Sequence, residues 1–193
     1  NLKMAMSLSG GFTQFKIDQK GWNLLHSSDP LIDGDVLVDL VPDATFGLNI
    51  YSEEKWYIGF AIPQLLNSSL SLVDSDFSDN VSLDIDGSLS RHIYLMGLYN
   101  MEISHYWDLQ PSLLYKYVNA TPSQLDIGIK TIYNDKFWMG MDYRNNGDIS
   151  ALLGFVIQDR YLLGYSYDIP NSNLSEYTSG SHEFMFGIRF TSA

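Results

Sequence analysis

The sequence predicts an all-β protein, a transmembrane antiparallel β-barrel built from hairpins. Three observations predict this fold class. Short segments alternate apolar and polar residues, their connections are alternately short and long, and aromatic residues gather near the segment ends. Because successive side chains of a strand point to opposite faces, such alternation gives each set its own side of a sheet.

The segment 124–133 shows the alternation best. One predicted face is mostly apolar and carries Leu125, Ile127, Ile129 and Tyr133, while the other carries Asp126, Gly128, Lys130 and Ile132. Similar patterns predict ten strands in all, at 2–17, 43–51, 55–63, 91–101, 106–118, 124–133, 136–145, 149–157, 160–168 and 182–191. An even number of strands is what a bacterial barrel requires.

The lengths of the connections orient the predicted barrel. Every second connection is short, at 52–55, 103–106, 134–135 and 158–160, and the others are 18–42, 64–90, 118–124, 145–148 and 169–181. Bacterial barrels have short periplasmic turns and longer extracellular loops. We therefore expect a periplasmic C-terminus and extracellular long loops, in the bacterial outer membrane.

Aromatic residues indicate contact with outer-membrane lipids. Beside the short turns, the predicted lipid face carries Trp56, Trp107, Tyr133, Phe137 and Tyr161, and at the opposite ends it carries Tyr117, Tyr143 and Tyr167. Two rings of interfacial aromatics are typical of a bilayer-spanning barrel. The alternative is a soluble sandwich or lipocalin-like barrel, in which the aromatics form cross-strand pairs.

Composition limits the function classes. With 193 residues, the chain is expected to form a single domain, 1–193, and no apolar run is long enough for a spanning helix. The net charge of −12 argues against nucleic acid as a partner, and the absence of cysteine excludes disulfides and thiolate metal sites. Residues 1–8 already have the pattern of mid-strand, so we expect the N-terminal strands to be missing.

Charged residues of both signs fall on the face predicted to line the lumen. Its predicted members are Lys116, Lys130, Trp138, Asp142, Arg144 and Arg189. These side chains could line a conducting pore, or they could interlock to fill the barrel. Mixed signs and the bulky Trp138 favour filling, because a selective porin more often shows one sign.

A second candidate group flanks the last long loop. The segments GYSYD (164–168) and GSHEF (180–184) supply Tyr165, Ser166, Tyr167, Asp168, Ser181, His182 and Glu183. In a functional interpretation, Asp168, His182 and Glu183 grip a partner segment at the extracellular rim. In the alternative, they hydrogen-bond to neighbouring strands and fix the loop.

Metal and catalytic motifs are weak. Asp74, Asp76, Asp79, Asp84 and Asp86 offer oxygen ligands for Ca²⁺, but they lack the spacing of an EF-hand, so a solvated loop and no cofactor are expected. A hydrolase site combining His92 with Ser90 or Ser112 has no nucleophile elbow to support it. The sequence therefore predicts that the protein is not an enzyme.

Several blocks of the sequence resemble the PorP/SprF family, outer-membrane components of the type IX secretion and gliding machinery of Bacteroidota. These blocks are 49–67, 122–144 and the pair GYSYD and GSHEF, and together the resemblance covers about residues 40–190. It implies a barrel of about fourteen strands that lacks its N-terminal strands in this chain.

The resemblance also implies a function. It implies a non-enzymatic anchor that docks on a periplasmic ring lipoprotein and holds the C-terminal domain of a secreted adhesin. Loops 18–42, 64–90 and 169–181 would then give specificity. A porin-like diffusion channel and an outer-membrane hydrolase are the alternatives.

Overall fold

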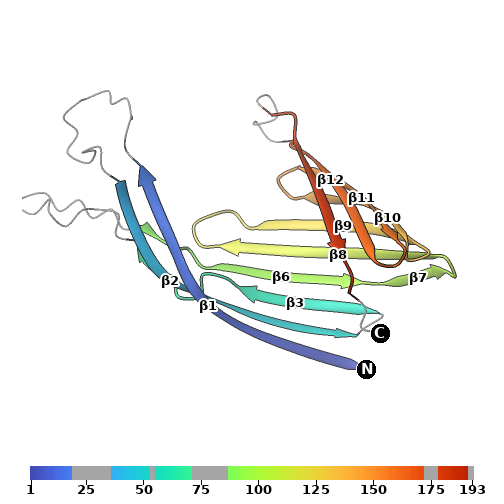
Figure 1. Ribbon diagram of the computed structural model, residues 1–193, viewed down its shortest axis with the longest axis horizontal. Helices are drawn as coiled ribbons and strands as arrows, with labels where there is room; N and C mark the ends of the chain where they lie inside the picture. Colours follow the sequence, from blue (N-terminus) through green and yellow to red (C-terminus); the bar gives the residue numbers. More distant parts are fainter. Residues whose placement is uncertain (19–35, 53–54, 71–86, 172–177, 191–193) are drawn as a thin grey trace, which may run out of the picture. The chain divides into compact units, whose positions relative to one another are not determined.

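The computed structural model is built from antiparallel β-strands (Figure 1). It describes residues 1–18, 36–52, 55–70, 87–171 and 178–190. Within these ranges, no helix is long and apolar enough to cross a membrane. The all-β fold class predicted from the alternation is therefore confirmed.

Ten strands form one continuous hydrogen-bonded path, in agreement with the predicted number. In path order they are β1 (Leu2–Asp18), β2 (Val36–Ser52), β3 (Trp56–Ile62), β6 (His92–Tyr99), β8 (Trp107–Val118), β9 (Gln124–Tyr133), β10 (Phe137–Arg144), β11 (Ile149–Ile157), β12 (Tyr161–Ile169) and β13 (Ser181–Ile188). Within the described ranges, a further strand, β7 (Met101–Ser104), pairs with β8 alone, and β4 (Ser69–Leu70) pairs with β5 (Gly87–Ser88). Among the described residues, no pairing closes the path between β1 and β13.

Three predicted boundaries were wrong. The strand β2 begins at Val36 rather than at residue 43, so Pro42 and Asp43 lie within it. The predicted strand 91–101 is divided at Asn100 into β6 and β7. The predicted loop 64–90 contains the short strands β4 and β5.

The chain divides into two compact units. The larger contains Asn1–Met6, Gly47–Ala61 and Ile93–Ala193, and the smaller contains Ser7–Phe46 and Ile62–His92. In the smaller unit, the backbone N–H of Leu65 donates to the carbonyl of Ala44 at 2.9 Å, and the Ser68 hydroxyl donates to the carbonyl of Pro42 at 2.6 Å. These bonds tie the segment after β3 to β2. The predicted site residues lie in the larger unit.

The strands of the larger unit have an apolar face and a polar face. The pairing of β9 with β10 places Ile129 opposite Met141 on the apolar face and Asp126 opposite Arg144 on the polar face. The pairings from β8 to β13 continue the same two faces. The predicted assignment of side chains to faces is therefore correct for these strands.

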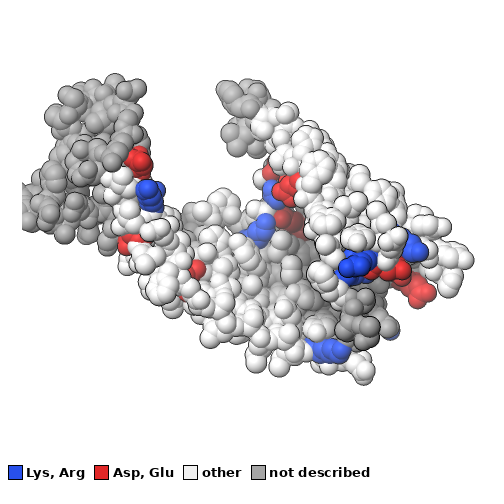
Figure 2. Space-filling model, in the orientation of Figure 1, with Lys and Arg blue, Asp and Glu red and all other residues white. Residues whose placement is uncertain are grey.

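The apolar face is exposed in this structure instead of forming a core. Its side chains are between 39% and 56% exposed at Ile127, Ile129, Met139, Met141, Leu153 and Phe155. Among the described residues, the only buried hydrophobic side chains are Val41 and Val156. Charged side chains gather in a few groups, with broad uncharged surfaces between them (Figure 2). An apolar surface of this extent requires an apolar environment.

The larger unit also has a short-turn end and a long-loop end. The connections at the short-turn end are 53–55, 105–106, 134–136 and 158–160, and those at the long-loop end are 119–123, 145–148 and 170–180. At the short-turn end, Asn134, Asp135, Gln158 and Asp159 have positive φ, as the mirror-image turns of tight hairpins require. The alternation of connection lengths predicted from the sequence is present in these strands.

Candidate functional site

The polar face carries a network of ion pairs near the long-loop end. Arg144 contacts Asp126 at 3.1 Å and Asp148 at 3.5 Å, and Lys116 contacts the second oxygen of Asp126 at 3.5 Å. Gln124 also donates its side-chain amide to Asp126, at 2.9 Å. The network thereby joins β8, β9, β10 and the turn after β10 through side chains of both signs.

Glycines leave room for the bulky side chains of the polar face. Trp138 lies opposite Gly154, which is opposite Gly164 on the next strand. A Cβ atom on Gly154 would collide with the Trp138 ring and would lie 2.7 Å from the carbonyl oxygen of Leu163. The ammonium of Lys130 lies 5.8 Å from the Trp138 ring centroid, within the range of a cation–π contact. The indole therefore covers two neighbouring strands.

A hollow of about 260 Å³ lies beside the ion pairs of Arg144 and Asp126. It is lined by Tyr57, Leu98, Ser112, Asp126, Asp142 and Arg144, among others. Asp142 lies over Gly128, where a Cβ atom would collide with its carboxylate. Of the predicted lumen-facing residues, the pairings place Lys116, Lys130, Trp138, Asp142 and Arg144 on the polar face together. Arg189 follows the last residue of β13, and its backbone N–H donates to the carbonyl of Arg160 at 2.8 Å.

The residues flanking the last long loop are divided between the two faces. Ser166, Asp168, Ser181 and Glu183 lie on the polar face, and Tyr165, Tyr167 and His182 lie on the apolar face. Asp168 and Glu183 are therefore on the opposite side of the sheet from His182. The Ser181 hydroxyl donates to Asp168 over a long 3.4 Å, so the carboxylate has room for a further donor.

On the apolar face, His182 joins an aromatic group. The hydroxyl of Tyr165 lies 2.7 Å from Nδ1 of His182, and the ring of Tyr167 stacks on His182 with centroids 4.6 Å apart. The hydroxyl of Tyr167 donates to the carbonyl of Ser179 at 2.5 Å, which ties the end of the loop to β12. These polar tips on aromatic rings suit a boundary between lipid and water.

The carboxylate of Asp148 anchors the start of the same loop, a role that the sequence did not predict. Its Oδ1 accepts the backbone N–H of Asn171 at 3.0 Å, and its Oδ2 accepts the side-chain amide of Asn146 at 2.8 Å. The hydrogen bond from Asn171, followed by that from Asn146, lowers the pKa of Asp148. The sequence NNGD indicated a turn, but the partner Asn171 is 23 residues away.

We predict that this anchor depends on pH. Because the folded pKa of Asp148 lies below the unfolded value of about 3.9, its stabilisation is complete above that value. The stabilisation is lost as the pH falls through the folded pKa. At neutral pH, Asp148→Ala should lower the hydrogen-exchange protection of the Asn171 amide by about fivefold, which corresponds to the loss of one hydrogen bond.

The control for this prediction is Thr121→Ala. Thr121 bonds only locally, to the carbonyl of Val118, in another loop at the same end. Its replacement should leave the protection of Asn171 unchanged. Equal protection in Asp148→Ala and the native protein at neutral pH would contradict the proposed anchor.

The remaining sequence-based candidates are a calcium site and a hydrolase site. The calcium candidates Asp74, Asp76, Asp79, Asp84 and Asp86 lie outside the described residues. Within the described ranges, no group of three or more His, Cys, Asp or Glu side chains could hold a metal ion. Nδ1 of His92 lies 2.8 Å from the backbone carbonyl of Ser90, so this contact does not involve the Ser90 hydroxyl.

The fold and its two faces define a class of protein. Antiparallel strands with an exposed apolar face, a charged opposite face and short turns at one end are those of an outer-membrane β-barrel protein. The family described as type IX secretion system membrane protein PorP/SprF matches residues 1–188. The chain therefore belongs to the PorP/SprF family. No curated protein and no solved structure matched the chain.

The family match extends the resemblance seen in the sequence. It begins at residue 1, whereas the resemblance covered about residues 40–190. The hairpin of β1 and β2 thus belongs to the matched region. The membrane location that the aromatic residues indicated agrees with the family description.

Proposed function

We propose that this protein is a non-enzymatic outer-membrane barrel of the type IX secretion and gliding machinery, which anchors secreted adhesin cargo at the cell surface and docks on the periplasmic ring. In this proposal, the short-turn end and the C-terminus are periplasmic, and the long-loop end is extracellular. The apolar face contacts the lipid of the outer membrane. The proposal extends the family assignment to particular partners.

The observation that carries this proposal is the interlocked polar face. Arg144 forms ion pairs with two carboxylates, the Lys130 ammonium contacts the Trp138 ring, and the indole packs against Gly154. In a closed barrel, such contacts would stiffen the wall and take up part of the interior. A selective channel would more often be lined by charges of one sign. The polar face therefore supports an anchor rather than a diffusion channel.

The cargo site is proposed at the long-loop end of β12 and β13. There, Asp168 and Glu183 lie on the polar face, and no ion pair within 4.0 Å engages either of them among the described residues. Tyr167 and His182 lie opposite each other on the other face at the same level. A segment of the adhesin's C-terminal domain that crosses this edge can meet carboxylates on one side and aromatic rings on the other.

Recovery of the adhesin's C-terminal domain tests the anchoring role. The purified full-length protein should retain this domain, and Asp168→Asn combined with Glu183→Gln should lower recovery by about tenfold, because two charge-assisted contacts are removed. Asp159→Asn at the short-turn end removes one carboxylate at a position of positive φ that asparagine tolerates, and it should bind normally. Unchanged recovery by the double variant would exclude this edge as the cargo site.

Conductance in planar bilayers tests the channel alternative with the same preparation. The filled polar face should give no large, steady current in the native protein. A steady current of porin size would overturn the anchor proposal in favour of a diffusion channel. The measurement needs no partner, so it is independent of adhesin recovery.

A further inference from the structure

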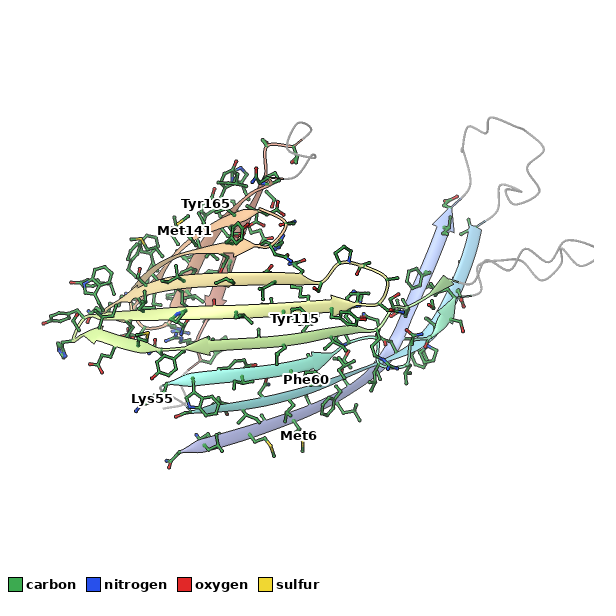
Figure 3. All side chains as sticks on the ribbon, turned by 180° about the vertical axis from the view of Figure 1, so that it is seen from behind. Met6, Lys55, Phe60, Tyr115, Met141 and Tyr165 are labelled. Carbon is green, nitrogen blue, oxygen red and sulfur yellow. The ribbon has the colours of Figure 1, made fainter. Side chains whose placement is uncertain are left out.

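At the short-turn end, β7 extends beyond the neighbouring strand β3. Strand β3 pairs with β6 up to Trp56 opposite Tyr99, and the N–H of Asn100 then donates to the carbonyl of Lys55 at 2.6 Å. Beyond this bond the chain continues as β7, which pairs only with β8. Figure 1 shows β7 running past the start of β3, and Figure 3 shows Lys55 at that start.

The other side of the same hairpin has a neighbour. Tyr133 of β9 lies opposite Trp107, and the N–H of Asn134 donates to the carbonyl of Tyr106 at 2.8 Å. The missing strand neighbour is therefore confined to the side of the hairpin that faces β3. Within the described ranges, that side of β7 has no strand neighbour over four residues, or about 13 Å of backbone. An unpaired strand edge presents N–H and C=O groups that another strand can pair with.

Two apolar side chains along β7 are exposed. Met101 is 45% exposed and Ile103 is 61% exposed, and Ile103 lies at a shift of register between Glu102 and Ser104. Short length, a charge and a bulge are features that limit unselective strand addition. We therefore expect this edge to pair only with an extended segment whose side chains complement those of β7.

A hollow of about 570 Å³ lies beside this edge and is rich in acceptors. It is lined by Lys55, Asn100, Glu102, Asp108 and Asp135, among others. Glu102 lies directly opposite Asp108, an arrangement that destabilises a strand pair when nothing compensates the charges. No ion pair to either carboxylate, or to Asp135, occurs among the described residues.

A buried oxygen adds a second unmet requirement. The side-chain Oδ1 of Asn100 is buried, and no hydrogen-bond donor reaches it in the described part of the chain. Buried polar atoms are normally hydrogen-bonded, and an exception calls for an explanation. Because Oδ1 is buried, a donor from a partner could reach it only after a local shift of this turn.

We propose that the free edge of β7 receives an extended segment of a partner polypeptide as an added strand, and that this segment places a lysine or arginine side chain in the adjoining hollow. The inference rests on the proposed function, because the partner is the periplasmic ring component on which the barrel docks. The backbone edge selects an extended polypeptide. The opposed carboxylates select a cationic hydrogen-bond donor, since Lys and Arg side chains donate without accepting.

Cysteine cross-linking tests the position of the added strand, and residues 1–193 contain no cysteine. In cells with the complete machinery, full-length protein carrying Ile103→Cys should cross-link to the ring lipoprotein through a short thiol-reactive linker. The matched control is Lys136→Cys, an exposed position in the neighbouring short turn of β9 and β10. We expect at least about tenfold more cross-linked product from position 103 than from position 136, because effective concentration rises steeply at a docked site. Equal yields would overturn the inference.

Charge removal tests the hollow separately. Glu102→Gln combined with Asp108→Asn should reduce retention of the purified ring lipoprotein by about tenfold, whereas Asp159→Asn should leave it unchanged. Removing two opposed carboxylates relieves repulsion, so the double variant should fold at least as well as the native protein. Heat-modifiable migration in gels checks that folding.

The outcomes separate this inference from the proposed function. If the native protein does not retain the ring lipoprotein, the proposed docking role fails. If the native protein and the Glu102/Asp108 variant retain it equally, and position 103 gives no selective cross-link, docking stands and the β7 site fails. A cross-link from position 103 to lipid or to a second copy of this chain, without the lipoprotein, would likewise overturn the β7 site.

Discussion

Replacing Leu153 by arginine is expected to destabilise the protein in a bilayer by about 2–4 kcal/mol, the cost of a cation on the lipid face near the bilayer midplane. Leu153 lies in the middle of β11, between Met139 of β10 and Tyr165 of β12. Its side chain is 39% exposed on the apolar face, so an arginine there meets no steric barrier in the protein itself. The expected cost therefore comes from the surroundings. Figure 3 shows Met141 and Tyr165, which lie on the same face.

The matched control is Ser150→Lys on the opposite face of the same strand. Ser150 lies between Asp142 and Asp168 in the pairing, so a lysine there gains two carboxylate neighbours and should be neutral or stabilising. Urea unfolding of full-length protein from lipid vesicles measures both variants. On a water-exposed face, Leu153→Arg would change stability by no more than about 0.5 kcal/mol. A change that small would contradict the membrane location of this face.

The sequence predicted the strands and faces of the C-terminal half well. A period of two follows from strand geometry itself, so residues such as Ile129 and Met141 could be assigned to one face without knowing their partners. The tight turns at 134–135 and 158–160 then fixed which strands are neighbours. Local geometry was sufficient in this region because each connection is a hairpin.

Features that depend on distant partners could not be predicted. Asp148 is an ordinary turn residue in the sequence, and only the arrangement of β10 to β12 brings it to Asn171. The division at Asn100 depends on where β3 begins, since the carbonyl of Lys55 accepts the Asn100 N–H. His182 was grouped with Asp168 because of proximity in the sequence motifs, but strand alternation places its side chain on the other face.

The glycines of the polar face show the same limit. From the sequence, Gly128 and Gly154 are simply small residues in strands, where glycine is usually unfavourable. The register explains them, because each lies opposite a residue that needs its space: Asp142 opposite Gly128, and Trp138 opposite Gly154. In each of these cross-strand pairs, the larger side chain therefore occupies the space that the glycine leaves free.

Gly154→Ala should consequently destabilise the protein by about 1–3 kcal/mol, the usual cost of overpacking. The added methyl group would meet the Trp138 ring and, at 2.7 Å, the backbone oxygen of Leu163, which cannot rotate away. Gly128→Ala should cost less, because its obstacles are the ends of the Asp142 and Ser112 side chains. Gly11→Ala, with nothing within 4 Å, should be tolerated or slightly stabilising.

A double variant tests whether the destabilisation by Gly154→Ala comes from contact with the Trp138 indole. Trp138→Leu gives the new methyl group room, so combining it with Gly154→Ala should cost less than the sum of the two single changes. The contact with the Leu163 carbonyl remains, which is why recovery should be partial. Unfolding from lipid vesicles gives all four free energies of one cycle. If Gly154→Ala were as stable as the native protein, or if the two changes were additive, then Trp138 would not rest on Gly154. The filled polar face that supports an anchor rather than a channel would lose its central contact.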